Sequence, residues 1–400
     1  MANIVRRIQD YNAGRDPERL QMKYRNMRSN AFVFLRGSCH LFYDRLPSSD
    51  LFKSAPLAWI CGDLHLENFG SYKGDNRLVY FDMNDFDEAV LAPASWELVR
   101  FLTSVLVGAD TLSATAAEAL VLCQSFIDAY AAALAQGHMR WVERDTAQGI
   151  VGDLLNSLRQ RQRPHHLNRR TERKGKQRIL RLDGKKALPV GAKQRARITA
   201  FMQQYAAQQP DPDFYQVLDV ARRIAGTGSL GVDRYVILVH GKGSPDGNYL
   251  LDLKQALPSA LLPHLKVAQP KWKSEAHRVV ELQRRCQAVS MAFLQPVMVG
   301  KTSYVLRGLQ PSEDRVTLDR PSHTMQELQR AIGTMGKIVA WDQLRSAGRQ
   351  GSASADELID FGQRKKWKRQ LMDMALDCAA QVHKDWLTYC RAYDDGDFTL

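Results

Sequence analysis

Two short acidic motifs near the start of the chain restrict most strongly what it can fold into. The first is Gly62-Asp63-Leu64-His65-Leu66-Glu67-Asn68, and the second is Tyr80-Phe81-Asp82-Met83-Asn84-Asp85. Residues 57–61 and 77–82 are apolar runs typical of short β-strands, and the turn-forming sequence Gly74-Asp75-Asn76 lies between them. We therefore expect a hairpin that carries the carboxylates of both motifs at its ends.

The residue types in these motifs suit phosphoryl transfer from ATP. Asp63 can orient an acceptor hydroxyl and accept its proton, while Asn68 and Asp82 can hold Mg²⁺ on the phosphates. Asp85, three residues after Asp82, is the best additional metal ligand. We expect His65 to serve as a hydrogen-bonding scaffold within the loop in preference to an acid or base. Taken alone, these groups also suit other metal-assisted hydrolysis or transfer reactions.

A glycine-rich segment in the middle of the chain supplies a second set of candidates. Residues 217–225, 234–240 and 248–254 are rich in β-branched and apolar side chains, which predicts three antiparallel strands. The GxGxxG sequence lies between the first two of them. A strand after the glycines favours the phosphate-covering loop of a kinase over a dinucleotide-binding loop, which a helix follows. The predicted nucleotide-binding residues are Gly226, Thr227, Gly228, Ser229 and Gly231.

Lys254 ends the third predicted strand and can reach the α- and β-phosphates of a nucleotide. Its expected partner is a glutamate of the next predicted helix, residues 273–293, and Glu281 is the first candidate and Glu275 the second. The alternatives are a solvated Lys254 and an ordinary surface pair between Glu281 and Arg284 or its neighbour Arg285.

Residues 303–309 predict a further strand at the edge of the adenine pocket. Its backbone, from about Leu306 to Leu309, is expected to contact the base. Arg36 is a secondary candidate for phosphate contact, although an arginine in an N-terminal helix more often forms a structural ion pair.

Positive charge is concentrated in residues 159–198. This segment holds fifteen Lys or Arg against Glu172 and Asp183, an excess equal to the net charge of the whole chain, +13. Such a segment can guide an anionic substrate, bind nucleic acid or be a solvated connection. Because it contains no aromatic residue to stack on bases, nucleic acid is possible but not favoured.

The remaining sequence predicts helices and a cytoplasmic location. Helical periodicity extends from residue 95 to about 158, and two further stretches, 325–347 and 355–393, close the chain around a Gly/Ser-rich break. The six cysteines are scattered without zinc-binding spacing. Residues 1–28 lack the apolar core of a signal peptide, and no continuous apolar run has the length of a membrane helix, so we expect no membrane partner.

These motifs resemble the bacterial family catalogued as domain of unknown function 2252, over about residues 25–393. The resemblance rests on Phe34–Gly37, Gly62–Gly70, Phe81–Ala89, Gly226–Gly231, Lys254–Ala256 and Arg278–Glu281. That family is grouped with protein-kinase-like and aminoglycoside-phosphotransferase-like folds. The resemblance implies that Asp63 matches the catalytic base, Asn68 and Asp82 the metal ligands, and Lys254 the phosphate lysine.

Two positions depart from these patterns. Cys61 stands where the phosphotransferases commonly have His, and Trp341-Asp342-Gln343-Leu344-Arg345 stands where an Ala-His-Ala-Arg-like stretch is expected. Any role of the histidine in the late helix is therefore absent from this chain.

The order of the motifs predicts an α+β, protein-kinase-like, two-lobed fold that is circularly permuted. In an ordinary kinase the glycine loop and lysine come first, whereas here they follow the catalytic motifs. The predicted parts are a catalytic, helical lobe (1–158), a basic connecting segment (159–198), a β-rich nucleotide lobe (199–310) and helices that return to the helical lobe (311–400). Permutation is tolerated where the new termini lie in exposed connections.

The predicted function is that of an ATP- and Mg²⁺-dependent phosphotransferase. Its acceptor is an unidentified hydroxyl-bearing small molecule, which residues 159–198 can guide if it is anionic. The alternatives are transfer of AMP from a nucleotide bound in a reversed pose, or a protein kinase; an ATP-binding pseudoenzyme or interaction module; and a basic nucleic-acid-binding protein.

Overall fold

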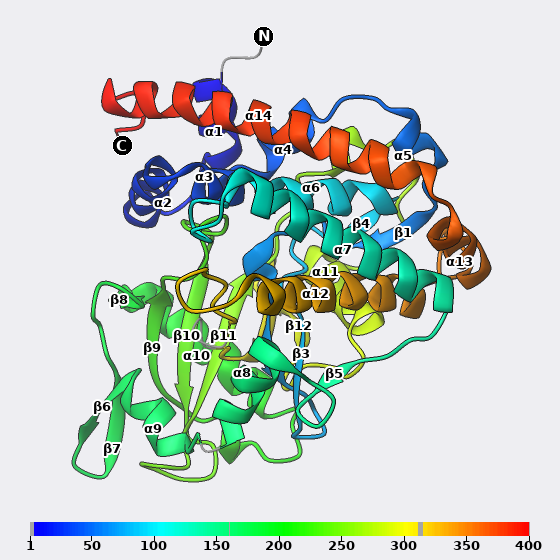
Figure 1. The fold of residues 1–400 in the computed structure, drawn as a ribbon. Helices are drawn as coiled ribbons and strands as arrows, with labels where there is room; N and C mark the ends of the chain where they lie inside the picture. Colours follow the sequence, from blue (N-terminus) through cyan, green and yellow to red (C-terminus); the bar gives the residue numbers. More distant parts are fainter. Residues whose placement is uncertain (1–3, 160, 311–314, 400) are drawn as a thin grey trace.

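Helices form the beginning of the chain in the computed structural model, which describes residues 4–159, 161–310 and 315–399 (Figure 1). They are α1 (Ile4–Asn12), α2 (Pro17–Ser29), α3 (Ala31–Gly37), α4 (Cys39–Arg45) and α5 (Asp50–Ser54). Asp16 caps α2 by accepting the Arg19 N–H, and Pro17 occupies the first turn, where its missing N–H is not needed. Asn30 caps α3 in the same way. The first acidic motif therefore follows a layer of short helices.

The acidic motifs lie on two small antiparallel pairings and not on one hairpin. Strand β1 (Leu57–Ile60) pairs with β4 (Val90–Pro93), and β2 (Phe69–Lys73) pairs with β3 (Val79–Met83), which also meets β5 (Val142–Glu143). The predicted hairpin between residues 57–61 and 77–82 is therefore wrong, although the turn at Gly74 is real. The β2 sequence Phe-Gly-Ser-Tyr-Lys has no apolar run or strict alternation, so it gave no strand signal.

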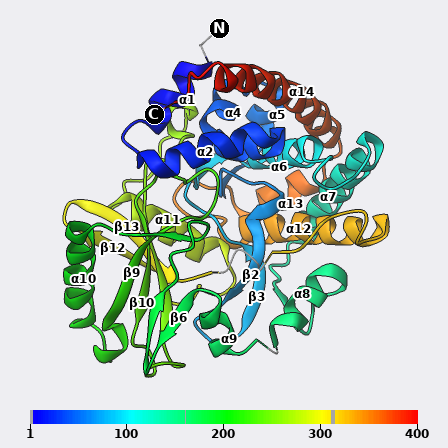
Figure 2. The ribbon, with the colours of Figure 1, turned by 90° about the vertical axis from the view of Figure 1, so that its left-hand side faces the viewer.

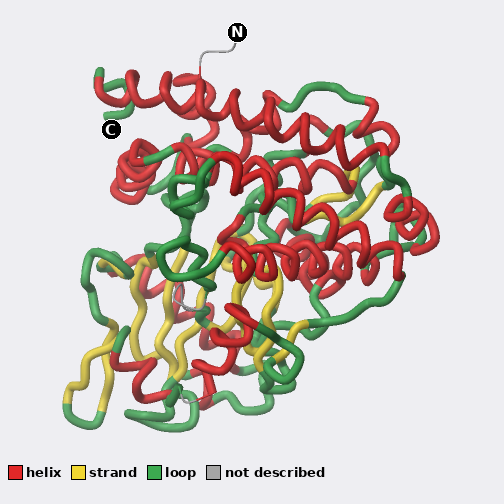
Figure 3. Tube along the Cα trace, viewed as in Figure 1, coloured by secondary structure: helices red, strands yellow, loops and turns green. Residues whose placement is uncertain are grey.

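Long helices form most of the upper part of the molecule (Figures 1 and 3). They are α6 (Ala94–Val107), α7 (Ala116–Gln136), α12 (Met325–Arg345), α13 (Ala355–Gln363) and α14 (Lys366–Asp394). Helix α8 (Gly149–Arg159) lies lower in Figure 1 and packs against α12 and β3. Capping boxes begin α7, α12 and α13. A Cβ on Gly336 would lie 2.6 Å from the Phe126 carbonyl oxygen, so this glycine lets α12 pack closely on α7. The predicted helix over 355–393 is two helices, because the chain leaves helical geometry at Arg364.

A six-stranded antiparallel sheet forms the lower part. Its order is β12 (Gln295–Val299), β13 (Thr302–Gly308), β11 (Tyr249–Gln255), β10 (Arg234–Val239), β9 (Val217–Arg223) and β8 (Ala187–Leu188). The three predicted strands of residues 217–254 are confirmed, as is the strand that follows the glycines. Helix α11 (Glu275–Cys286) is shorter than predicted because Gln287 adopts an extended conformation.

The two faces of this sheet are covered by different elements (Figure 2). Ile198 and Met202 of α10 (Ala192–Ala206) pack on one face against Tyr235 and Ile237 of β10. The other face meets Leu180 of the β6–β7 hairpin (Thr171–Lys174 and Gln177–Leu180), which follows the short helix α9 (Arg163–Asn168). Both faces are therefore buried under parts of the basic segment.

Residues 159–198 are an integral part of the sheet body and not a separate connection. Strand β8 pairs with β9, and Arg178, 2% exposed, donates to Asp246 and to the Pro245 carbonyl oxygen. The predicted boundary between residues 198 and 199 falls inside α10. Residues 311–314, where the last predicted part begins, lie outside the described residues. The mixed α+β class is confirmed, and the C-terminal helices pack against α6 and α7.

In the described part of the chain, α7 has the length and apolar composition of a membrane-spanning helix. Half of its most apolar window is buried inside the structure, and one such helix is weak evidence for a membrane span.

Candidate functional site

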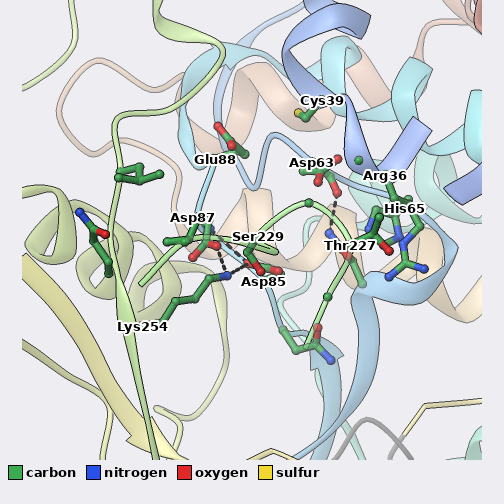
Figure 4. Close-up of a pocket in the computed structure, with 18 of the residues that line it drawn as sticks. Arg36, Cys39, Asp63, His65, Asp85, Asp87, Glu88, Thr227, Ser229 and Lys254 are labelled. Atoms are coloured by element: carbon green, nitrogen blue, oxygen red, sulfur yellow. Dashed lines mark hydrogen bonds and ion pairs between the residues drawn. The ribbon is translucent and has the colours of Figure 1, made fainter. Parts of the chain in front are cut away.

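One cavity of about 90 Å³ brings the acidic motifs, the glycine loop and Lys254 together (Figure 4). Its polar lining comprises Tyr11, Arg15, Arg36, Asp63, His65, Asn68, Asn84, Asp85, Asp87, Glu88, Thr227, Ser229, Lys254, Gln255 and Arg315. The two predicted halves are separated by more than 140 residues in the sequence, and the fold places them around the same space.

Asp63 is held with one oxygen anchored and the other facing the cavity. Its Oδ1 accepts hydrogen bonds from Nε of the fully buried Arg100, at 2.7 Å, and from Nη2 of the same residue. Its Oδ2 faces the glycine loop, since a Cβ on Gly228 would lie 3.9 Å from it. Burial raises the pKa of Asp63, and the positive charge of Arg100 opposes this effect. Oδ2 is thus the atom available to accept a proton.

The turn that carries Asp63 requires a glycine before it. Gly62 has φ +83°, and a Cβ there would lie 2.4 Å from the Glu88 carbonyl oxygen. Both conditions exclude any other residue without a shift of the backbone. The close approach fixes the first acidic motif against the segment that follows the second.

Asn68 and His65 complete the first motif. Asn68 Nδ2 donates to the Asp63 carbonyl oxygen at 2.5 Å, which leaves Oδ1 as the amide atom that can ligate a cation. His65 Nδ1 accepts the Glu67 N–H at 3.2 Å and so caps the short 3₁₀ turn Leu66–Asn68. Burial lowers the pKa of His65 well below its usual value, so the ring is neutral. This contact is the scaffold role expected for His65.

Lys254 is paired with the second acidic motif and not with α11. Its Nζ forms an ion pair with Asp87 and lies 4.0 Å from Asp85 Oδ1 (Figure 4). The predicted pairing with Glu281 or Glu275 is wrong, because these carboxylates pair with arginines one turn along their own helix. Glu281 lies 3.6 Å from Arg284, and Glu275 lies 2.7 Å from Arg278. Burial acts to raise the pKa of Asp85, but Lys254, Arg307 and Arg234 outweigh it and lower that pKa.

Asp82, a predicted metal ligand, does not line the cavity. Its carboxylate accepts the Met83 N–H at 2.8 Å and lies against Asp342 and Arg345 of α12. Burial raises the pKa of Asp82 to about 6, and burial together with Asp82 raises the pKa of Asp342 well above its usual value. The prediction failed because alternate strand residues face opposite sides, and Asp82 lies on the side of β3 that faces α12.

Asn68, Asp85 and Asp87 are among the side chains with oxygen atoms that do line the cavity. Within residues 4–159, 161–310 and 315–399, no group of three or more His, Cys, Asp or Glu side chains is arranged to hold a metal ion. A cation here would need additional oxygens from a ligand, as Mg²⁺ commonly does with phosphates.

The backbone of residues 306–309 is not at a sheet edge. Strand β13 lies between β11 and β12, and Leu306 is paired on both sides, with Leu253 and Gln295. The Leu309 N–H donates to the Leu250 carbonyl oxygen at 2.9 Å. Neither Leu306 nor Leu309 is among the residues that line the cavity, so the structure does not bring the predicted base-contacting backbone to it.

The glycine loop is held down on the cavity by the N-terminal helices. Arg15 Nη1 donates to the Gly228 and Leu230 carbonyl oxygens at 2.8 and 3.2 Å. The fully buried Lys23 donates to the same Gly228 oxygen at 3.0 Å and to Asn12. A cavity of about 90 Å³ is smaller than the roughly 300 Å³ of small-molecule sites, and the glycine loop covers part of it.

Sequence patterns missed Arg15, Lys23 and Arg100 because each acts on a residue far away in the chain. Arg100 offered one signal, since it and Glu97 are the charged residues of an otherwise apolar helix. Arg15 and Lys23 lie in a polar segment where basic residues are common. Nothing local distinguishes them from solvated side chains.

A model of the bacterial family DUF2252, described as an uncharacterized protein conserved in bacteria, matches residues 15–392. The chain therefore belongs to this family. No curated protein and no solved structure shows significant similarity to it.

Proposed function

We propose that this protein transfers the γ-phosphoryl group of ATP to a hydroxyl group, with Mg²⁺. The observation that carries the proposal is the convergence of Asp63, Asn68, Asp85, Lys254 and the glycine loop on one cavity. These are the residue types that phosphoryl transfer requires: a base, oxygen ligands for the metal, a phosphate-binding lysine and a covering loop.

The positions of these groups on the sheet support the same conclusion. The glycine loop joins the first two of three consecutive antiparallel strands, β9 and β10, and Lys254 is on the third, β11. Protein kinases place their glycine loop over the phosphates and their lysine on the third strand. A likeness to kinases is further supported by the helix α11, which follows β11 and contacts β13 and β12.

The order of these parts supports a circularly permuted arrangement. The helical part with Asp63 precedes the sheet with Lys254, and α14 returns to pack along α1 and α6. Gln9 donates to the Asp397 carbonyl oxygen at 2.8 Å, so the two ends of the described chain lie close together (Figure 1). Adjacent ends are the condition under which permutation preserves contacts.

Each residue of the cavity has a separate role in this proposed reaction. Asp63 Oδ2 receives the proton of the acceptor hydroxyl, while Arg100 fixes the orientation of the carboxylate. Lys254 exchanges Asp87 for nucleotide phosphates, because both are anionic partners within its reach. Asn68 and Asp85 would hold Mg²⁺, which neutralises charge on the phosphates.

A second candidate, transfer of AMP, is favoured by one observation. Arg223, Arg234 and Arg307 surround the fully buried Asp252, with nitrogen–oxygen distances of 2.7, 2.6 and 3.3 Å. Asp252 lies two residues before Lys254 and on the same face of β11. None of the three arginines is among the residues that line the Asp63 cavity, so their excess charge would act at a distance on the triphosphate of a nucleotide bound in the reversed orientation. The acceptor would displace pyrophosphate from such a nucleotide.

Product analysis with Mg·ATP tests the proposal and separates the two candidates. Phosphoryl transfer releases ADP, whereas nucleotidyl transfer releases pyrophosphate and leaves AMP on the acceptor. Lys254→Met should abolish release of ADP, and Lys242→Met, in a loop outside the cavity, is the control. ATP binding without any turnover would favour the pseudoenzyme.

A further inference from the structure

A second cavity, of about 280 Å³, lies beside the first and is lined by more basic than acidic side chains. Among the described residues, its basic side chains are Arg36, Arg169, Arg170, Arg181, Lys185, Lys186, Arg223 and Arg315, and its acidic ones are Glu67 and Asp183. The two cavities share Arg36, Arg315, Gly226 and Thr227. The second cavity therefore adjoins the Asp63 cavity at Arg36, Arg315 and the first residues of the glycine loop, so that a ligand bound in it can extend toward Asp63.

The basic segment is folded so that its cations are held at this cavity. Arg178 anchors the β6–β7 hairpin through Asn168, at 2.7 Å, and through Asp246, at 2.6 Å. The Arg181 N–H donates to the Arg170 carbonyl oxygen at 2.9 Å, which ties the two ends of the hairpin together. Positions fixed in this way lose little conformational entropy when a ligand binds.

The turn after the hairpin is also fixed. Asp183 Oδ1 accepts the backbone N–H groups of Lys185 and Lys186 at 2.9 and 2.6 Å. Burial acts to raise the pKa of Asp183, but these donors outweigh it and lower that pKa, so the carboxylate stays ionised. The turn therefore presents two consecutive lysines at the cavity.

Arg36, which Figure 4 shows among the residues of the first cavity, also lines the second and supplies a buried positive charge to both. It is 9% exposed, and its Nε has no hydrogen-bond partner within the described residues. Its Nη1 lies 2.8 Å from Glu67 Oε2, and Arg315 lies 2.5 Å from the same oxygen. Two guanidinium groups therefore share one carboxylate, and an anion would balance the remaining charge.

We infer that the second cavity binds the phosphate groups of the acceptor, which is a small molecule with at least two phosphates and a free hydroxyl. This inference rests on the proposed phosphotransferase function. Guanidinium groups match phosphate oxygens with paired hydrogen bonds, and ammonium groups add charge. The cavity has no aromatic side chain among its lining residues, so it lacks the stacking surface that single-stranded nucleic acid uses.

The reaction that follows is balanced by ATP alone. The acceptor oxygen forms a bond to the γ-phosphorus, the bond from this phosphorus to the β–γ bridging oxygen breaks, and ADP leaves. The hydroxyl proton passes to Asp63 Oδ2.

Calorimetric titration with fructose 1,6-bisphosphate, a sugar with two phosphates and free hydroxyls, tests the cavity on the full chain. Lys185→Glu/Lys186→Glu should weaken its binding by about tenfold or more, since two attractive charges become repulsive. Lys174→Glu/Lys176→Glu is the matched control, because it makes the same charge change in the same segment at exposed residues outside the cavity. Lys185→Ala/Lys186→Ala should show a smaller loss, and thermal unfolding checks that all variants fold.

Three outcomes would overturn the inference. They are no measurable binding, equal weakening by both charge-reversal pairs, and displacement of the probe by the non-hydrolysable nucleotide AMP-PNP with Mg²⁺. The last would assign these cations to the phosphates of the nucleotide. ATP turnover, measured in parallel, addresses the proposed function separately, because its absence leaves the comparison of the lysine pairs intact.

Discussion

Replacing Asp63 by Asn should abolish catalysis with little loss of stability. Replacement by Ala should abolish catalysis and also lower the free energy of unfolding. In Asp63→Asn the side-chain carbonyl can still accept from Arg100, while the NH₂ group takes the place of Oδ2, the atom that faces the cavity. An amide cannot accept the proton of a hydroxyl. Because general-base catalysis contributes roughly 10²–10⁴-fold, the reaction barrier should rise by about 3–5 kcal/mol.

The stability of the two variants should differ because Arg100 is fully buried. In Asp63→Ala its guanidinium loses the carboxylate, and removing one partner of a buried ion pair costs about 3–5 kcal/mol. In Asp63→Asn a neutral acceptor remains, so the loss should be about 1–2 kcal/mol. Thus the difference in the free energy of unfolding measures the anchoring by Arg100.

The assays are ADP release from Mg·ATP and urea unfolding of each variant. Asp145→Asn is the control, since the Asp145 side chain is 76% exposed and far outside the cavity lining. An Asp63→Asn protein with the unmutated rate would refute the role as base. Equal unfolding free energies for the Asn and Ala variants would refute the role of Arg100.

Three further predictions concern the metal site, the carboxyl pair and the glycine loop. Asp85→Asn should weaken Mg²⁺-dependent nucleotide binding at least several-fold, whereas Asp82→Asn should leave it unchanged. Calorimetric titrations with and without Mg²⁺ measure both effects. A larger loss for Asp82→Asn would restore Asp82 as a metal ligand. The folded-state pKa of Asp82, about 6, exceeds its usual value of 3.8. The stability linked to this group is therefore fully present below pH 3.8 and is lost as pH rises through 6. Across this range the free energy of unfolding in urea should fall less steeply with pH for Asp82→Asn than for the unmutated protein, and identical slopes would contradict this. Arg15→Ala removes two bonds that hold the loop down, so nucleotide affinity should rise by about two- to tenfold, and an unchanged or lower affinity would show that the loop is not a barrier.

Local sequence patterns predicted which residues form strands and turns. The errors concern features, such as strand pairing, that depend on residues distant in the sequence. The strands of residues 217–254, the loop between them and the turn at Gly74 all followed from short-range signals. The pairing of β1 with β4 in place of β3 depends on which strands meet in space. No pattern within residues 57–82 contains that information.

The candidate site shows the same division at the level of single side chains. Both acidic motifs and Lys254 were found from residue types and spacing, and they do meet at one cavity. The sequence did not show which carboxylate faces the cavity. Asp82 and Asp85 are the same residue type and differ only in their positions, one on β3 and the other in the turn that follows it. Residues 341–345, which differ from the expected Ala-His-Ala-Arg-like stretch, include Asp342 and Arg345, and the structure shows that these two side chains face Asp82.

The glycine loop forms a wall of both cavities, since Gly226 and Thr227 line each of them. A ligand that changes the position of the loop from one cavity therefore also changes the shape of the other cavity. By thermodynamic linkage, any change that one ligand causes in the affinity for the other is returned by the same factor. For the proposed phosphotransferase, we expect the affinities for ATP and for the acceptor to be coupled, with the same factor measured in either direction.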